Sequence, residues 1–280
     1  MRKKLILPAL LLLLAFLPFC SCAAVSIGDL LEEESVLPET PDETGSGDTG
    51  LTLADYKTDK EGVLSGKVLG FERNILFNYH QAENGSSDFL LIGFEGSGMN
   101  PRAEGSCIIW NEALNPYNVI DFTVANEISY WQKKESEKAA ETYSAMVLDV
   151  IREKFSGIRT IGIFAFSKGS SGVDCTFSRL KKEGYDISFI WLNDSFAVNG
   201  LPAVTVALLN NEITLYNRYS NSQRLNPQSR QLHQLYADRP NVDSRHIGTY
   251  HGGLLKYSTF SEELVGAIEK AINESDREFR

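Results

Sequence analysis

The sequence is poor in the residues from which most metal centres are built. It contains only four cysteines and four histidines among 280 residues, and they show neither the spacing nor the clustering of a zinc site. We therefore predict no metal and no cofactor for this chain. A disulfide between Cys107 and Cys175 stays open at this stage, because spacing alone does not show whether two thiols meet.

Positive charge is also scarce. The net charge is -10, and no cluster of Lys and Arg forms the basic stripe that nucleic-acid binding requires. Many of the acidic residues lie between positions 29 and 48, and no Lys or Arg occurs between Lys4 and Lys57. The negative charge therefore belongs mainly to an N-terminal tail, and nucleic acid is not expected as a partner.

The longest apolar run, residues 5–19, follows three basic residues at 2–4. It is shorter than the roughly 20 residues that cross a bilayer, so this start is typical of a signal peptide. The segment Phe19-Cys20-Ser21-Cys22 resembles the lipobox of bacterial lipoproteins, which implies cleavage before Cys22 and acylation of its thiol. We expect residues 1–22 to direct export, with the protein held at the cell surface only by this lipid; secretion after cleavage behind residue 23 or 24 is the alternative.

Residues 23–58 combine the acidic residues with Pro38, Pro41 and a run rich in glycine, serine and threonine at 44–50. Such a segment buries too little apolar surface to offset the entropy lost on ordering. We predict a disordered tether, followed by one folded domain at 59–280.

Within that domain, strand-like and helix-like patterns alternate. Two short β-rich runs, 66–71 and 74–79, predict a hairpin that turns at Glu72 and Arg73. Apolar runs predict buried strands, and apolar residues at three- and four-residue spacing predict helices. This alternation favours an α/β fold with a mostly parallel sheet and helices on both faces. The further expected strands are 88–94, 118–124, 160–166, 187–192, 212–217 and one within 242–250, and the expected helices are 135–155, 168–183, 201–209, 228–236 and 261–272.

Ser167 directly follows the apolar run 160–166 and lies between small residues, in the pattern Ala165-x-Ser167-x-Gly169. This is a variant of the G-x-S-x-G turn, in which a tight bend between strand and helix presents a nucleophilic serine. Because the backbone at such a bend approaches its neighbours closely, small residues are needed on both sides.

Ligands of such sheets bind beyond the carboxyl ends of the strands. The groups that follow strands here are, in chain order, the glycine-rich loop 95–98, Ser167, Asp194 and His251. In this order, from about Gly66 to the C-terminus, the chain resembles the α/β-hydrolase fold. The resemblance implies a Ser-His-Asp triad and an oxyanion hole, formed by the backbone N–H groups of Ser97 and Lys168, although Glu95 stands where the family usually has histidine.

Two assignments within this triad keep alternatives. His251 precedes two glycines after the last strand and is the expected base, while His246, within that strand, is the competitor; His80 and His233 have structural roles. Many members of the fold carry the acid after the strand that ends here near Asn217, but residues 218–223 contain no carboxylate. Asp194 is therefore the expected acid, as in some lipases of this fold. Asp238 and Asp243 are the alternatives.

The short stretch between Asp194 and Leu201 leaves no room for a large cap, so we expect an open site with Met99, Trp110 and Phe196 as apolar walls. An open site with an oxyanion hole suits hydrolysis of a small-molecule carboxylic ester through an acyl-enzyme. A serine peptidase and a catalytically inactive binding module for a cell-envelope ligand are the alternative functions.

Overall fold

The structure, a computed structural model, describes residues 63–68, 71–83, 88–124, 133–197, 200–222, 224 and 226–278. The predicted signal peptide at 1–22, the acylated Cys22, the tether at 23–58 and the start of the domain at 59 lie outside these residues. The described residues belong to one compact unit, Asp48–Arg280. None of the described helices has the length and apolar character needed to cross a membrane.

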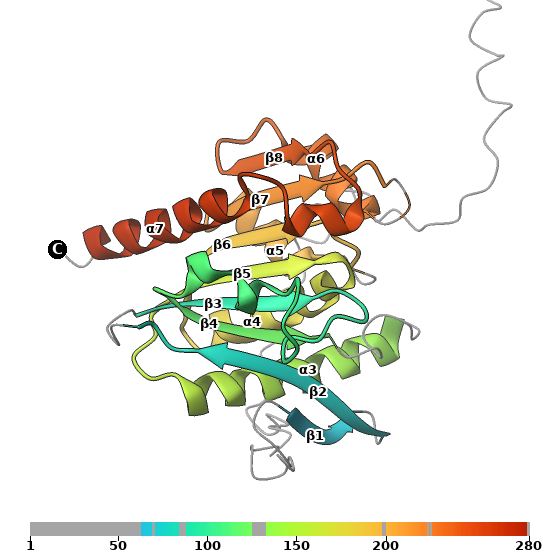
Figure 1. Ribbon diagram of the computed structural model, residues 1–280, viewed down its shortest axis with the longest axis vertical. Helices are drawn as coiled ribbons and strands as arrows, with labels where there is room; N and C mark the ends of the chain where they lie inside the picture. The colour runs from blue at the N-terminus through green and yellow to red at the C-terminus, as the bar shows by residue number, and fades with distance from the viewer. Residues whose placement is uncertain are drawn as a thin grey trace, which may run out of the picture. The chain divides into compact units, whose positions relative to one another are not determined.

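An eight-stranded sheet lies at the centre of the fold, in the order β1-β2-β4-β3-β5-β6-β7-β8 (Figure 1). The pairs β1–β2 and β2–β4 are antiparallel, and all the other pairs are parallel. This arrangement confirms the predicted mostly parallel sheet with an N-terminal antiparallel hairpin. The strands are β1 (Val63–Val68), β2 (Phe71–His80), β3 (Phe89–Glu95), β4 (Asn118–Thr123), β5 (Thr160–Phe166), β6 (Asp186–Asn193), β7 (Thr214–Tyr219) and β8 (Val242–His246).

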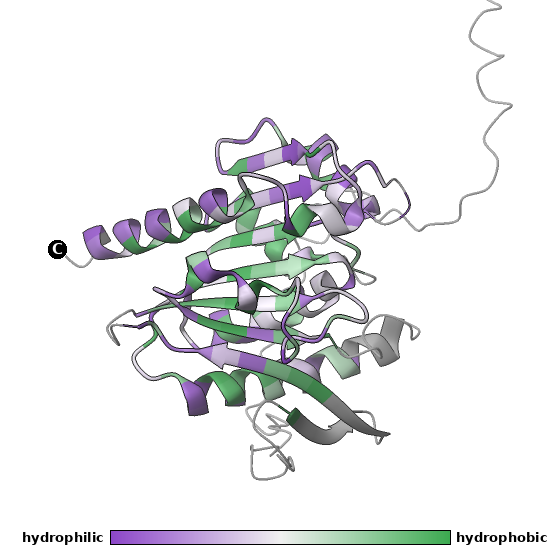
Figure 2. Cartoon of the chain, viewed as in Figure 1, coloured by the Kyte–Doolittle hydropathy of each residue, from purple (hydrophilic) through white to green (hydrophobic). Residues whose placement is uncertain are grey.

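The central strands are covered on both faces. Every residue of β3 and β5 is buried, as expected for continuous apolar strands between two layers of helices. Figure 2 shows the same concentration of hydrophobic residues in the middle of the sheet. The helices are α3 (Lys133–Lys154), α4 (Val173–Lys182), α5 (Pro202–Leu209), α6 (Pro227–Tyr236) and α7 (Phe260–Glu278), with short 3-10 helices η2 (Ile108–Trp110), η3 (Glu112–Leu114), η4 (Ser167–Gly172) and η5 (His251–Leu255).

Two hydrophobic clusters divide these helices between the faces of the sheet. The cluster on one face takes apolar residues from α3, α4, α5 and α6, whereas the other takes them from α7 and η2. Cys107 packs in the cluster of α7, and Cys175 packs against the cluster of α3 and α4. Both thiols are free, so the disulfide that the sequence left open does not form.

Two boundaries differ from the sequence prediction. Glu72 and Arg73 are not in the hairpin turn but lie within β2, where they pair with Lys67 and Gly66 of β1. This part of β2 pairs with β1 alone, and the antiparallel ladder runs through both residues without a turn. The chain after β5 also enters α4 only after η4, since its first turns are wound more tightly as a 3-10 helix.

A buried arginine ties β7 to the C-terminal helix. The side chain of Arg218 is 1% exposed and donates to carboxylate oxygens of Asp243 at 3.0 Å and Glu263 at 2.9 Å. Its guanidinium also lies 4.8 Å from the centroid of the Trp191 ring. Two carboxylates and an aromatic face thus compensate for the cost of burying this cation.

Candidate active site

Ser167 occupies a strained turn at the carboxyl end of β5. Its backbone has φ 52, which is the left-handed region that residues with a Cβ seldom adopt. Ser167 is 9% exposed, and it begins η4 directly after the last residue of the strand. A serine in this conformation, between a buried strand and a helix, has the geometry of a nucleophile elbow.

Two glycines allow the turn to approach the end of β3. A Cβ on Gly169 would lie 2.0 Å from the carbonyl oxygen of Phe94, and one on Gly96 would lie 2.9 Å from Phe166 and 3.3 Å from the Cβ of Ser167. No side chain larger than hydrogen fits at Gly169 without displacing the backbone. The glycine-rich loop after β3 and the turn after β5 are therefore in direct contact.

Asp194 follows β6, the next strand of the sheet, and is fully buried. One carboxylate oxygen accepts hydrogen bonds from the Ser220 backbone N–H at 2.7 Å and the Asn226 amide at 2.8 Å. The other accepts from the Ser220 hydroxyl at 2.6 Å and contacts His251 Nδ1 at 2.7 Å. Each lone-pair direction of this carboxylate thus faces a donor, which compensates for the cost of burying it.

Ser220 and Asn226 are the site residues that the sequence analysis missed. Ser220 directly follows β7, in the place where many members of the fold carry the acid. Its hydroxyl and its N–H both donate to Asp194 instead. Asn226, which is itself held by Arg230 at 2.9 Å, adds a third donor. The sequence did carry one signal for them. The loop after β7 has no carboxylate, and an acid at the end of the neighbouring strand needs neutral hydrogen-bond donors from that loop.

His251 begins η5 and is partly buried, with its side chain 22% exposed. An ionised carboxylate only accepts hydrogen bonds, so the contact with Asp194 assigns the proton to Nδ1 and leaves Nε2 as an acceptor. The imidazole also stacks on the Phe166 ring, with centroids 4.7 Å apart. Since Phe166 is the residue before Ser167, this stacking places the imidazole beside the elbow.

The competing histidines have other partners. His246, at the end of β8, is exposed and contacts the Asn221 side chain at 2.8 Å. His80 contacts the Leu114 carbonyl oxygen, and His233 contacts the Ser244 hydroxyl. None of these three histidines contacts Asp194 within the described part of the chain.

The alternative acids are also engaged elsewhere or exposed. Asp243 forms ion pairs with Arg218 and Arg245, and Asp238 is an exposed residue after α6. Among the carboxylates considered from the sequence, only Asp194 contacts an imidazole in the described residues.

The two predicted oxyanion donors lie at adjacent strand ends. Ser97 is in the turn after β3, closed by a hydrogen bond from the Met99 N–H to the Gly96 carbonyl oxygen at 3.2 Å. Lys168 directly follows Ser167 in η4. Because β3 and β5 pair in parallel, with Phe94 opposite Ala165, both backbone segments are at the same edge of the sheet.

The expected walls of the site fall into two groups. Phe196 is adjacent to the elbow, since its N–H donates to the Ser167 carbonyl oxygen at 3.1 Å, and Met99 follows the glycine-rich loop. Trp110 was expected at the same site, but it lines a cavity of about 970 Å³ together with Asn78 and His80 of β2. Because β2 is antiparallel to β4, the carboxyl end of β2 lies at the other end of the parallel strands.

No protein-family model matches the chain, and no curated protein matches it in sequence. Solved structures resemble it in fold at low identity. Est1E from Butyrivibrio proteoclasticus is 12% identical over 76% of this chain and 98% of its own, with a TM-score of 0.44. A putative hydrolase from Agrobacterium vitis S4 is 10% identical over 75% and 97%, with a TM-score of 0.49. An esterase from Pyrobaculum calidifontis is 10% identical over 79% and 88%, with a TM-score of 0.48. The strand order and the strained turn after β5 identify the fold of this chain as that of the α/β-hydrolases.

Proposed function

We propose that the protein is a serine hydrolase that cleaves carboxylic esters, with Ser167 as nucleophile, His251 as base and Asp194 as the acid that orients it. One observation carries the proposal: a fully buried carboxylate, surrounded by donors, lies 2.7 Å from Nδ1 of an imidazole whose ring stacks on the residue before Ser167. A buried ionised carboxylate holds the imidazole in the tautomer whose Nε2 accepts a proton.

In the proposed reaction, Nε2 of His251 accepts the hydroxyl proton as the Ser167 oxygen attacks the ester carbonyl carbon. The negative charge that develops on the carbonyl oxygen is stabilised by the N–H groups of Ser97 and Lys168. The tetrahedral intermediate then collapses, the C–O bond to the alcohol breaks, and the imidazolium gives its proton to the leaving alkoxide. Water, deprotonated by the same imidazole, hydrolyses the acyl-enzyme and regenerates Ser167.

Features of the surrounding chain favour esters over amides. The connection from Asp194 to α5 is short, so this loop contributes no large cap over the elbow. An ester leaves as an alkoxide that needs little assistance, whereas an amine must be protonated and held in extended subsites.

We further propose that acylated Cys22 and the acidic segment 23–58 hold this domain at the outer face of a bacterial membrane. The support is the sequence pattern of residues 2–23. Incorporation of labelled fatty acid should be lost in Cys22→Ala and kept in the neighbouring variant Cys20→Ala. Equal labelling of both variants contradicts acylation at Cys22.

A fluorophosphonate probe tests the proposed nucleophile directly, because it reacts with serines that are activated by a base. We expect stoichiometric labelling of the wild type at Ser167 and none in Ser167→Ala. Ser171→Ala is the matched control, since Ser171 lies four residues further along the same segment and bonds only weakly to the Phe196 carbonyl oxygen at 3.4 Å. A folded wild type that the probe does not label refutes the proposal and favours a binding module.

Activity toward acyl esters of increasing chain length would then define the substrate. Hydrolysis of peptide amides at a comparable kcat/KM would identify a peptidase instead.

A further inference from the structure

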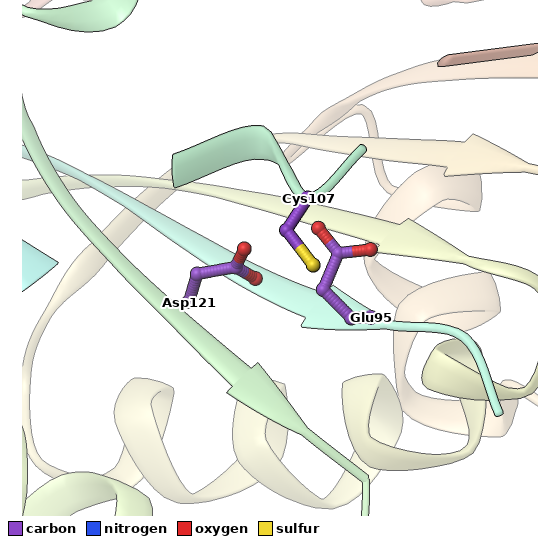
Figure 3. A group of neighbouring side chains, drawn as sticks. All are labelled: Glu95, Cys107 and Asp121. Carbon is purple, nitrogen blue, oxygen red and sulfur yellow. The ribbon is translucent and has the colours of Figure 1, made fainter. Parts of the chain in front are cut away.

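Three titratable side chains meet in the interior, where the segment that joins β3 to β4 packs on the sheet. They are Glu95 at the end of β3, Cys107 just before η2, and Asp121 within β4 (Figure 3). Both carboxyl groups are fully buried and the thiol is 5% exposed. One potential ligand atom from each residue lies within 4.8 Å of the others, and Figure 3 shows the sulfur between the two carboxyl groups.

The two carboxyl groups of this cluster lack partners for part of their polar surface. The ion pairs recorded among the described residues include neither Glu95 nor Asp121. Glu95 Oε2 and Asp121 Oδ1 are buried without a hydrogen-bond partner, and such atoms carry a desolvation cost that a ligand would remove.

The three side chains are held in place by their neighbours. The Ile108 N–H donates to Glu95 Oε1 at 2.8 Å, and the Ile109 N–H contacts Asp121 Oδ2 at 3.4 Å. The remaining oxygen of Asp121 lies 2.3 Å from where a Cβ on Gly93 would be, so glycine at that position makes the space for it. Glu95 thus has one oxygen held by the start of η2, Asp121 has a longer contact there, and the other oxygen of each lies buried without a partner.

We propose that Glu95, Cys107 and Asp121 form a binding site for one divalent transition-metal ion of the zinc class. A thiolate with two carboxylates suits Zn²⁺, whereas Ca²⁺ and Mg²⁺ require more oxygen ligands and no sulfur. Zinc–ligand distances of about 2.0–2.3 Å place tetrahedral ligand atoms roughly 3.5 Å apart. The cluster therefore contracts slightly on binding, and a water supplies the fourth ligand.

A cavity is lined by residues close in sequence or register to the cluster, although none of the three proposed ligands lines it. The cavity of about 970 Å³ is lined by Gly105 and Ile109, each two residues from Cys107, and by Asn78. Asn78 is the register partner of Asp121 across β2 and β4.

The spacing of residues in the sequence did not predict this site, because its ligands come from three separate elements. The inference does not depend on the proposed esterase activity.

Cobalt is the probe for this site, because a thiolate ligand gives Co²⁺ a charge-transfer band in the near ultraviolet. We expect the reduced, chelator-treated full-length protein to bind one equivalent of Co²⁺ with this band, and Zn²⁺ to displace it. Cys107→Ser should abolish the band and weaken Zn²⁺ binding by ~100-fold or more. Cys175→Ser is the matched control, since Cys175 packs on the opposite face of the sheet; it should keep both.

Two results would overturn the site. One is a wild type without the charge-transfer band, in which case the carboxyl groups only share a proton. The other is a band of equal strength in Cys107→Ser, which would assign it to a thiol other than Cys107. If Cys107→Ser does not fold, Asp121→Asn replaces it: it keeps the thiol, and it should weaken Zn²⁺ binding at least tenfold, whereas unchanged affinity refutes the proposal.

Discussion

Replacing Asp194 by asparagine tests the orientation of His251 with the smallest change of shape. The oxygen of the new side-chain amide can still accept from the Ser220 N–H and the Asn226 amide, so the fold of the loops should persist. The nitrogen of that new amide, however, would face His251 Nδ1 and donate to it. The imidazole then carries its proton on Nε2, and a protonated Nε2 has no lone pair with which to accept the proton of Ser167.

The magnitude follows from this change of tautomer. A wrong tautomer in a Ser-His-Asp site costs roughly 10⁴-fold in kcat, which is ~5.5 kcal/mol of transition-state stabilisation. We expect the full loss because the contact between Asp194 and Nδ1 is short, at 2.7 Å, and the carboxylate is fully buried. Because the position is buried, no water can reach it to accept a hydrogen bond from Nδ1 instead of the carboxylate.

Ser220→Ala is the control for this prediction. It removes one donor to Asp194 but leaves the carboxylate and the histidine tautomer intact. Loss of a hydrogen bond to a charged acceptor is worth about 1.5–3 kcal/mol, so kcat should fall by a hundredfold or so at most. The assay is kcat toward an activated aryl ester at constant pH, with thermal unfolding to verify folding. If folded Asp194→Asn keeps more than a tenth of wild-type kcat, Asp194 is not the orienting acid.

The remaining predictions concern the elbow and the buried ion pairs. Gly169→Ala should prevent folding or abolish probe labelling, because its Cβ would lie 2.0 Å from the Phe94 carbonyl oxygen; a folded, labelled variant refutes the packing of the elbow. Arg218→Met should lower the free energy of unfolding in urea by about 3–5 kcal/mol, since it leaves Glu263 and Asp243 with only the exposed Arg245 as a cation; a loss under about 1 kcal/mol argues against that cost. Desolvation raises the pKa of Glu263, but hydrogen bonds from Thr259 and Arg218 outweigh it and lower the pKa overall. Ionised Glu263 therefore stabilises the fold above its unfolded pKa of about 4.3, and the stability difference from Glu263→Gln should shrink as pH falls through the lower folded pKa. A difference independent of pH contradicts this linkage.

Sequence patterns predicted the sheet well, because central parallel strands are apolar on both faces. The runs that became β3 and β5 are buried throughout, and no helix-like spacing competes with them. The hairpin turn was wrong, since Glu72 and Arg73 lie in β2. Two adjacent charged residues indicated a turn, although the backbone ladder of β1 and β2 runs through them.

The candidate site was predictable only as far as strand ends could be recognised. Ser167, Asp194 and His251 each follow a strand, and sheet topology brings strand ends to one edge. The donors around Asp194 could not be predicted in the same way, because Ser220 and Asn226 have no distinctive spacing and act through the packing of β7 against α6. Trp110 was misplaced because the segment between β3 and β4 folds along β2, away from the elbow.

The surroundings of the proposed acid are built by two neighbouring strand ends. The carboxylate comes from the end of β6, while the residue after β7 supplies only donors at 2.6 and 2.7 Å. An exchange at these two positions, Asp194→Asn with Ser220→Asp, would move the acid to the position that many members of the fold use. In the proposed triad, the position of the acid thus depends on which of these two neighbouring strand ends carries the carboxylate and which carries the donors.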